Sequence, residues 1–305
     1  MGNWFTRLFG ARSSKTPAAA ASPAPPRPIP FPAPTATATP EPPAARRFNP
    51  LEAEFLEGFL TSAPARSLDE LALDDRLFIA GIRNRWHKRQ LDLPVLPQAA
   101  IELRELLRRG DVAIPRYVEL LEQDSALTVE VLKAANSAQL GGATTVTNTA
   151  DAVVRIGLQR LETILLLAQV KSKVLKGGPL QTLGEMLVTM ALPMAVAASK
   201  LAASRQQDTN LAFTRATLLH VEHLVILGAL PDVSREHKRT LAPSVAAVHQ
   251  AFTAYGAEIR QAVARSWGLE DLLIGGDEAE SLTAHFASLR NQLAAEWLEN
   301  DRRAA

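Results

Sequence analysis

Three histidines in the second half of the chain are the residues best suited to chemistry. His220 and His223 are three positions apart in the run His220-Val221-Glu222-His223, so on a helix they share one face. His249 is a third imidazole that could converge on them, and neutral imidazole is a common metal ligand. The spacing differs from that of helical His-Glu-x-x-His zinc sites, and it also fits one partly buried and one solvated histidine. We predict no metal site; these three histidines are the only candidates.

Other enzyme signatures are missing from the sequence. It has no Gly-rich dinucleotide or phosphate loop and no Ser-centred nucleophile motif. Gly141 and Gly142 could present backbone N–H groups to an anion, but a simple turn explains the pair as well. Asp124, Asn136 and Ser137 are polar, yet their places at predicted helix ends favour capping. We therefore predict no catalytic residue, no cofactor-binding residue and no cofactor.

The elements that must position these residues centre on a helix that begins after Asp124. Asp is a favoured N-cap because its carboxylate accepts the free N–H groups of the first turn. Leu127, Val131 and Ala135 recur every four residues and predict one buried face. Asn136 can then close the helix, since Asn tolerates the conformations found at helix ends.

A second, shorter helix is predicted to follow. Thr147 or Thr149 can cap it, and it ends near Gly157. A third helix begins at Leu158. Strand-like alternation is essentially absent from the chain, so an all-α, multi-helix bundle is expected.

Several further helix boundaries can be predicted. The capping box that starts at Ser67 is expected to open a long helix. Pro193 is expected to interrupt and kink a helix over 181–205, and Pro231 to close a single helix over 209–229. The other predicted helices cover residues 50–61, 98–109, 115–123, 243–267 (ended by Gly268) and 278–301.

The helix after Asp124 carries a resemblance to the HDOD family. That family has an upstream Leu-Pro-x-Leu-Pro, then a D-x-x-L-T-x-x-x-L-x-x-x-N-S run, then a helix that ends in Gly-Leu-x-x-Leu. The matching residues are Leu93, Pro94, Leu96 and Pro97, then Asp124, Leu127, Thr128, Leu132, Asn136 and Ser137, then Gly157, Leu158 and Leu161. The resemblance implies an all-helical relative of the HD and HD-GYP metal phosphohydrolases that lacks their catalytic residues.

The resemblance also indicates where a metal centre would stand. HD-type hydrolases bind divalent ions through a His on one helix, an adjacent His-Asp pair on the next, and later histidines, and the metal generates hydroxide. The matching positions here hold Leu192, then His220 followed by Val221, then Gly256. Because neither Val nor Gly has a ligating side chain, the resemblance implies that this chain is not an enzyme.

The domain organisation follows a shift in composition. Residues 1–15 are a short apolar and basic tip, and residues 16–48 are an Ala/Pro-rich linker with 11 of the 20 prolines, expected to be disordered. Accessory helices over 49–90 are expected to pack on an HDOD domain over 91–285. Residues 286–305 complete the C-terminal helix and tail.

Charge and composition narrow the choice of partners. The formal net charge is +1, and residues 1–47 hold six basic and one acidic residue, which leaves the rest mildly acidic. Nucleic acid is therefore not an expected partner. The absence of Cys suits a reducing cytoplasm, which is the expected location. No uninterrupted apolar run approaches the roughly 18–20 residues of a membrane span, so no transmembrane segment is expected.

Together these features favour a non-enzymatic bacterial signal-transduction module that binds protein partners, as the resemblance to HDOD scaffolds implies. Candidate partner contacts are Trp4, Phe5 and Phe9 in the tip, which also suit peripheral membrane contact, and Arg155 and Arg160 in the domain. One alternative is a residual metal phosphohydrolase built on the three histidines. Another is a module that senses a cyclic dinucleotide through a pocket with Arg or backbone donors.

Overall fold

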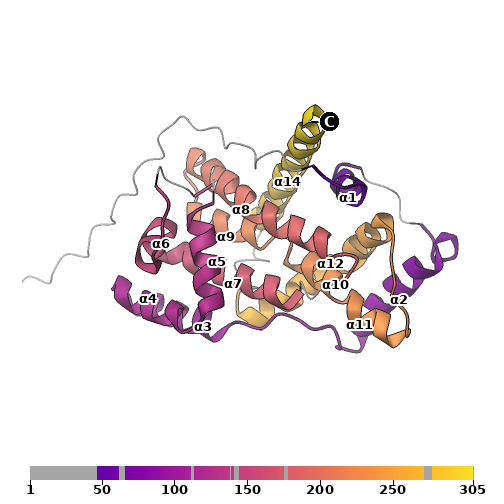
Figure 1. Cartoon of the computed structure of the whole chain (residues 1–305), viewed down its shortest axis with the longest axis horizontal. Helices are drawn as coiled ribbons and strands as arrows, with labels where there is room; N and C mark the ends of the chain where they lie inside the picture. Colours follow the sequence, from indigo (N-terminus) through magenta and orange to yellow (C-terminus); the bar gives the residue numbers. More distant parts are fainter. Residues whose placement is uncertain are drawn as a thin grey trace, which may run out of the picture. The chain divides into compact units, whose positions relative to one another are not determined.

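The computed structural model describes residues 47–61, 66–110, 113–137, 139–140, 144–174, 178–270 and 277–304 (Figure 1). All regular structure in these ranges is helical, which confirms the all-α class. Residues 16–46 of the Ala/Pro-rich arm lie outside them, as do Trp4, Phe5, Phe9, Gly141 and Gly142. The helices are α1 (Pro50–Leu60), α2 (Leu73–His87), α3 (Gln98–Arg108), α4 (Ile114–Glu122), α5 (Ser125–Ala135), α6 (Thr149–Ile156), α7 (Leu158–Val174), α8 (Gln181–Ser204), α9 (Thr209–Thr217), α10 (Val221–Gly228), α11 (Leu230–Glu236), α12 (Val245–Trp267) and α14 (Asp277–Ala304).

The predicted start and buried face of α5 are confirmed. The Asp124 carboxylate accepts hydrogen bonds from the backbone N–H groups of Ala126 at 2.9 Å and Leu127 at 3.2 Å. Leu127, Val131 and Ala135 are all buried. The local sequence pattern therefore fixes both the first turn of α5 and the direction in which the helix packs.

Asn136 does more than end α5. Its side-chain amide donates to the Val146 carbonyl at 2.7 Å and its amide oxygen accepts from the Val146 N–H at 2.8 Å. This two-bond clasp fixes the segment that leads into α6. The predicted cap of α6 was wrong: Asn148, rather than Thr147 or Thr149, accepts from the Asp151 N–H at 2.8 Å.

The predicted single helix over 209–229 was also wrong, and the difference matters for the histidines. The chain forms α9, then a turn, then α10, and His220 is the N-cap residue of α10. Pro231 opens α11 instead of closing a helix, because proline is well tolerated in a first turn, where its missing N–H has no intrahelical partner. The turn at 218–220 places His220 where α9 and α10 meet.

Two other predicted boundaries differ from the structure. At Ser67 one half of the predicted capping box is found, since its N–H donates to a Glu70 carboxylate oxygen at 3.2 Å, but the segment that follows is a short 3-10 turn (Leu68–Glu70). Ala72 is the N-cap residue of α2. In α8 the helix is not interrupted at Pro193 but runs on to Ser204. At α12 the predicted stop is confirmed, since Gly268 ends the helix with a φ of 61°.

The helices before the matched domain motifs pack against the later helices. In Figure 1 α1 lies beside α14, and α1 also contacts α8 and α12. Phe48 stacks on Trp297 with ring centroids 5.9 Å apart, and its N–H donates to an Asp301 carboxylate oxygen at 3.0 Å. The two ends of the described chain are thus joined directly.

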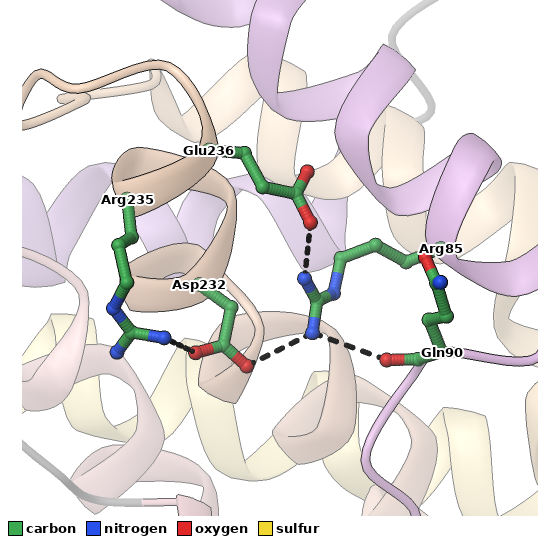
Figure 2. Close-up of polar contacts among 5 residues, drawn as sticks. All are labelled: Arg85, Gln90, Asp232, Arg235 and Glu236. Carbon is green, nitrogen blue, oxygen red and sulfur yellow. Dashed lines mark hydrogen bonds and ion pairs between the residues drawn. The ribbon is translucent and has the colours of Figure 1, made fainter.

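A charged cluster ties α2 to α11 (Figure 2). Arg85 on α2 donates to Asp232 at 3.0 Å, to Glu236 and to the Gln90 carbonyl at 3.1 Å. Arg235 holds the other oxygen of Asp232 at 2.8 Å. A single guanidinium therefore fixes the end of α2 against both acidic side chains of α11.

Two stretches of the described chain are long and apolar enough to span a membrane by length and composition: Gln181–Ser204 and Thr209–Glu236. The second is divided among α9, α10 and α11, and 83% of its apolar window is buried. A helix that is buried on several sides in a protein core has the same apolar composition as a membrane-spanning helix.

Candidate functional site

Two of the three candidate histidines, His220 and His223, lie with Glu222 where α10 packs against α12. His220, Glu222 and His223 are all buried, with 3%, 0% and 8% of their surfaces exposed. Buried polar groups are uncommon in an otherwise aliphatic core and need partners. The charged side chains around them come from α12 and α14, which are distant from α10 in the sequence. We call these residues, with His249, Arg260, Arg290 and Phe59, the histidine centre.

His220 and His223 are paired with each other. Their Nδ1 atoms are 3.0 Å apart and their rings stack with centroids 5.0 Å apart. One Nδ1 must donate and the other accept, so at least one ring is neutral. Burial lowers the pKa of both imidazoles well below 6.5, and the positive charges of Arg290 and Arg260 lower it further. We infer that both rings are neutral at pH 7.

The third histidine does not join this pair as a ligand. The Nε2–H of His249 donates to the Phe55 carbonyl of α1 at 3.1 Å. Its ring packs edge-on against Phe59, with centroids 4.8 Å apart. Gly58 leaves room for it, because a Cβ at that position would lie 2.3 Å from His249 Nε2. The structure thus brings His220 and His223 together and commits His249 to α1.

The cation in the centre is a guanidinium. Arg260 on α12 forms an ion pair with Glu222, whose side chain is completely buried, while Arg260 retains 25% exposure. Burial raises the pKa of the Glu222 carboxyl, and the charge and hydrogen bond of Arg260 oppose that rise. The His223 Nε2 lies 3.7 Å from the same carboxylate. Glu222 is therefore held mainly by Arg260.

A second guanidinium enters from α14. Arg290 lies over the Phe59 ring, 4.3 Å from its centroid, which is cation–π geometry. Burial lowers its pKa to about 10, although the Glu222 charge acts to raise it. Arg290 is thus still protonated at neutral pH. Phe59 itself is close to all three histidine rings, so α1 covers the centre.

These residues do not fit a divalent metal. Val221 is buried in the core at 2% exposure, and Gly256 faces Glu222, since a Cβ there would lie 3.4 Å from the Glu222 Cγ. Within the described ranges, no three His, Asp or Glu side chains are grouped so that they could hold a metal ion. The one carboxylate near the histidine pair is already neutralised by Arg260, and a metal ion beside that guanidinium would be repelled.

A small cavity adjoins the centre. It has a volume of about 10 Å³ and is lined mostly by apolar side chains of α7, α8 and α10, together with Thr217 and His220. That is roughly the space of one water molecule. This cavity is far too small for a cyclic dinucleotide, and it contains none of the Arg donors that such a site was expected to present.

The two arginines proposed as partner contacts are used inside the domain. Arg155 donates to the Thr144 carbonyl at 2.9 Å and to the Ala135 carbonyl at 3.4 Å. Arg160 donates to Ser199 at 3.0 Å and to Asn210 at 3.3 Å, and its guanidinium lies over a Phe ring of α9. Both side chains link neighbouring elements, and their contact with a partner stays a prediction.

The sequence did not indicate Arg260, Arg290 or Phe59 as members of the centre. One signal was available: Glu222 lies in a run of apolar residues that predicts burial, and a buried carboxylate requires a positive partner. Nothing local says which of the 33 basic residues supplies it. Arg260 is 38 residues further along the chain, so only the packing of α12 on α10 identifies it.

The chain is similar to known proteins in both sequence and fold. The HDOD domain model matches residues 93–276. An uncharacterized protein of Treponema pallidum (strain Nichols) is 35% identical over 74 residues, which is 24% of this chain and 14% of that protein. The chain thus spans only a small part of that relative.

Solved structures show a similar arrangement of helices. A protein of Shewanella amazonensis SB2B, provisionally named a metal-dependent phosphohydrolase, superimposes with a TM-score of 0.52 at 16% identity, covering 73% of this chain and 81% of its own. An HDOD domain protein of unknown function from Geobacter sulfurreducens gives a TM-score of 0.47 at 22% identity, covering 70% and 76%. At 16% identity, the similarity to the Shewanella amazonensis protein shows a shared fold alone.

Proposed function

Because the chain belongs to the HDOD domain family, we propose that it is a non-enzymatic bacterial signal-transduction module that acts in the cytoplasm by binding protein partners. The family match covers the helices from α3 to α12. Members of this family resemble metal phosphohydrolases in fold, and the motif resemblance implies that His220, Val221 and Gly256 stand at positions where such hydrolases hold a metal. The side chains in that centre are the main support for the proposal.

The observation that carries the proposal is the ion pair between Arg260 and the fully buried Glu222. A hydrolytic metal site needs several neutral or anionic ligands facing an open position. Here the neutral imidazole pair is bonded to itself, and the carboxylate faces a permanent cation. This arrangement links α10 to α12 and leaves no unpaired negative charge in the centre to hold a divalent ion.

Metal content and turnover test the proposal directly. Purified full-length protein is loaded with Mn²⁺, Mg²⁺ or Fe²⁺, desalted and measured by elemental analysis, and phosphodiesterase turnover is assayed in parallel. We expect less than stoichiometric metal and no turnover above the level of His220→Ala. One tightly bound metal per chain, or turnover that His220→Ala abolishes, would overturn the proposal.

Partner binding is tested separately. Cell extract is passed over immobilised full-length chain and over a chain that lacks residues 1–47, and captured proteins are compared. We expect the same signalling protein to be enriched by specific, saturable binding to the domain in both forms. If no protein is retained more strongly than on an unrelated helical domain, the binding role fails.

A further inference from the structure

The histidine centre contains more positive than negative charge. Glu222 is the carboxylate that faces the two guanidiniums, and it forms its ion pair with Arg260. The hydrogen bonds of Arg290 go to the amide oxygen of Asn291, at 3.0 and 2.8 Å, and no ion pair to a carboxylate is found for it in the described part of the chain. With the pKa values of His220, His223 and His249 all lowered, the three rings are neutral at pH 7, and two guanidiniums against one carboxylate leave the centre with a net charge of +1.

Several buried polar atoms in the centre also lack a partner. They are the Nε of Arg260, the Oε2 of Glu222 and the Nε2 of His220. Buried polar groups in folded proteins are usually hydrogen-bonded, and exceptions often mark the place of a water molecule or an ion. The Nε–H of Arg260 is a donor, and beside an excess of positive charge an anionic acceptor would match it; the Oε2 of Glu222 is an acceptor and would be matched by a donor such as water.

The two arginines of the centre are less buried than Glu222 and the histidine pair. Glu222 is completely buried, but Arg260 retains 25% exposure and Arg290 is only half-buried. Arg290 comes from α14 and lies against Phe59 of α1, so its guanidinium is at the edge of the centre rather than at its middle. Both arginine side chains are therefore partly exposed at the margin of the centre, whereas the histidine pair lies inside it.

We propose that Arg260 and Arg290 form a binding site for a small phosphate-class oxyanion, either free or as the terminal group of a phosphate monoester. The planar guanidinium presents its N–H donors in a fork that matches phosphate oxygens. One such anion neutralises the excess charge and links α12 to α14. The site goes beyond the proposed function, because it needs no protein partner and no metal.

Thermal unfolding of the full-length chain tests the site. Inorganic phosphate and a phosphate monoester are titrated separately, each against sodium chloride at equal ionic strength. At a ligand concentration about 100-fold above Kd, the unfolding midpoint should rise by about 5–11 °C and saturate. A response to phosphate alone indicates a free ion, and a stronger response to the ester indicates the terminal group of a larger ligand; both support the site.

Variants on α14 supply the matched control. Arg290→Gln should lose the response, whereas Arg303→Gln should keep it, because Arg303 is 73% exposed and pairs with Glu299. Sulfate and phosphate strengthen folding weakly by exclusion from any protein surface, but that effect does not saturate. No saturable rise in the wild-type chain, or an undiminished rise in Arg290→Gln, would disprove the site.

Discussion

Replacing Arg260 by Met tests whether the guanidinium holds the centre together. Met fills a similar length of side-chain space but removes the charge and every N–H donor. Glu222, with 0% exposure, would then lose its hydrogen-bonded ion-pair partner and keep only the weaker influence of the His223 Nε2 at 3.7 Å and of the Arg290 charge. A buried carboxylate without a cation is costly because it has lost its hydration without compensation.

The size of the effect can be reasoned from the burial of each partner. Removing one member of a buried ion pair costs about 3–5 kcal/mol. Arg260 is partly exposed, so water can approach Glu222 in the variant, and we expect a loss of about 3 kcal/mol in the free energy of unfolding. For a folded part of this size that corresponds to a fall of about 6–12 °C in the melting midpoint.

The assay is urea unfolding followed by circular dichroism, with a double-mutant cycle. Glu222→Gln in the Arg260→Met background removes the stranded charge, so the double variant should regain about 1–2 kcal/mol relative to Arg260→Met. Arg265→Met is the matched control, since Arg265 is exposed on the same helix and should change stability by less than about 0.5 kcal/mol. Equal losses for Arg260→Met and Arg265→Met, or additive effects of the two substitutions at the ion pair, would refute the reasoning.

Three further predictions concern the same framework. The free energy of unfolding should fall as the pH drops from about 6.5 towards 5. The pKa values of His220 and His223 are lowered in the folded state, so the unfolded chain binds more protons at these two residues in that pH range. Urea unfolding midpoints measured at several pH values test this. Gly58→Ala should destabilise the chain by about 1–3 kcal/mol, because the new Cβ would overlap the His249 ring; thermal unfolding measures the loss. Asn136→Ala should cost about 1–3 kcal/mol, because it removes both side-chain hydrogen bonds to Val146 and leaves those backbone groups unpaired; chemical denaturation measures it.

Each of these has a decisive contrary result. If replacing His223 with Leu leaves the slope of stability against pH between 5 and 6.5 unchanged, the buried imidazoles are not its source. If Gly58→Ala is as stable as the wild-type chain, α1 does not press on His249 as described. If Asn136→Asp, which retains only the acceptor, is as stable as the wild-type chain, the clasp to Val146 contributes little.

The sequence alone determined the parts of this protein that depend on neighbours three or four residues away. The Asp124 cap, the buried stripe of α5 and the end of α12 at Gly268 are such features, since a helix bonds within one turn and its cap is adjacent. The family motifs and the all-α class were readable for the same reason. The cap at Asn148 was also available locally, because Asn is a stronger N-cap than the two threonines on either side of it that were predicted instead.

The tertiary structure alone decided what the centre contains. The packing of α10, α12 and α14 decides where α9 ends, at Thr217, and which residues are the partners of Glu222. This packing cannot be predicted from the local sequence pattern. The sequence predicted that metal ligands were missing at Val221 and Gly256. It did not show that Arg260 and Arg290 supply the positive charge, because a long-range ion pair is selected by burial and distance rather than by spacing along the chain.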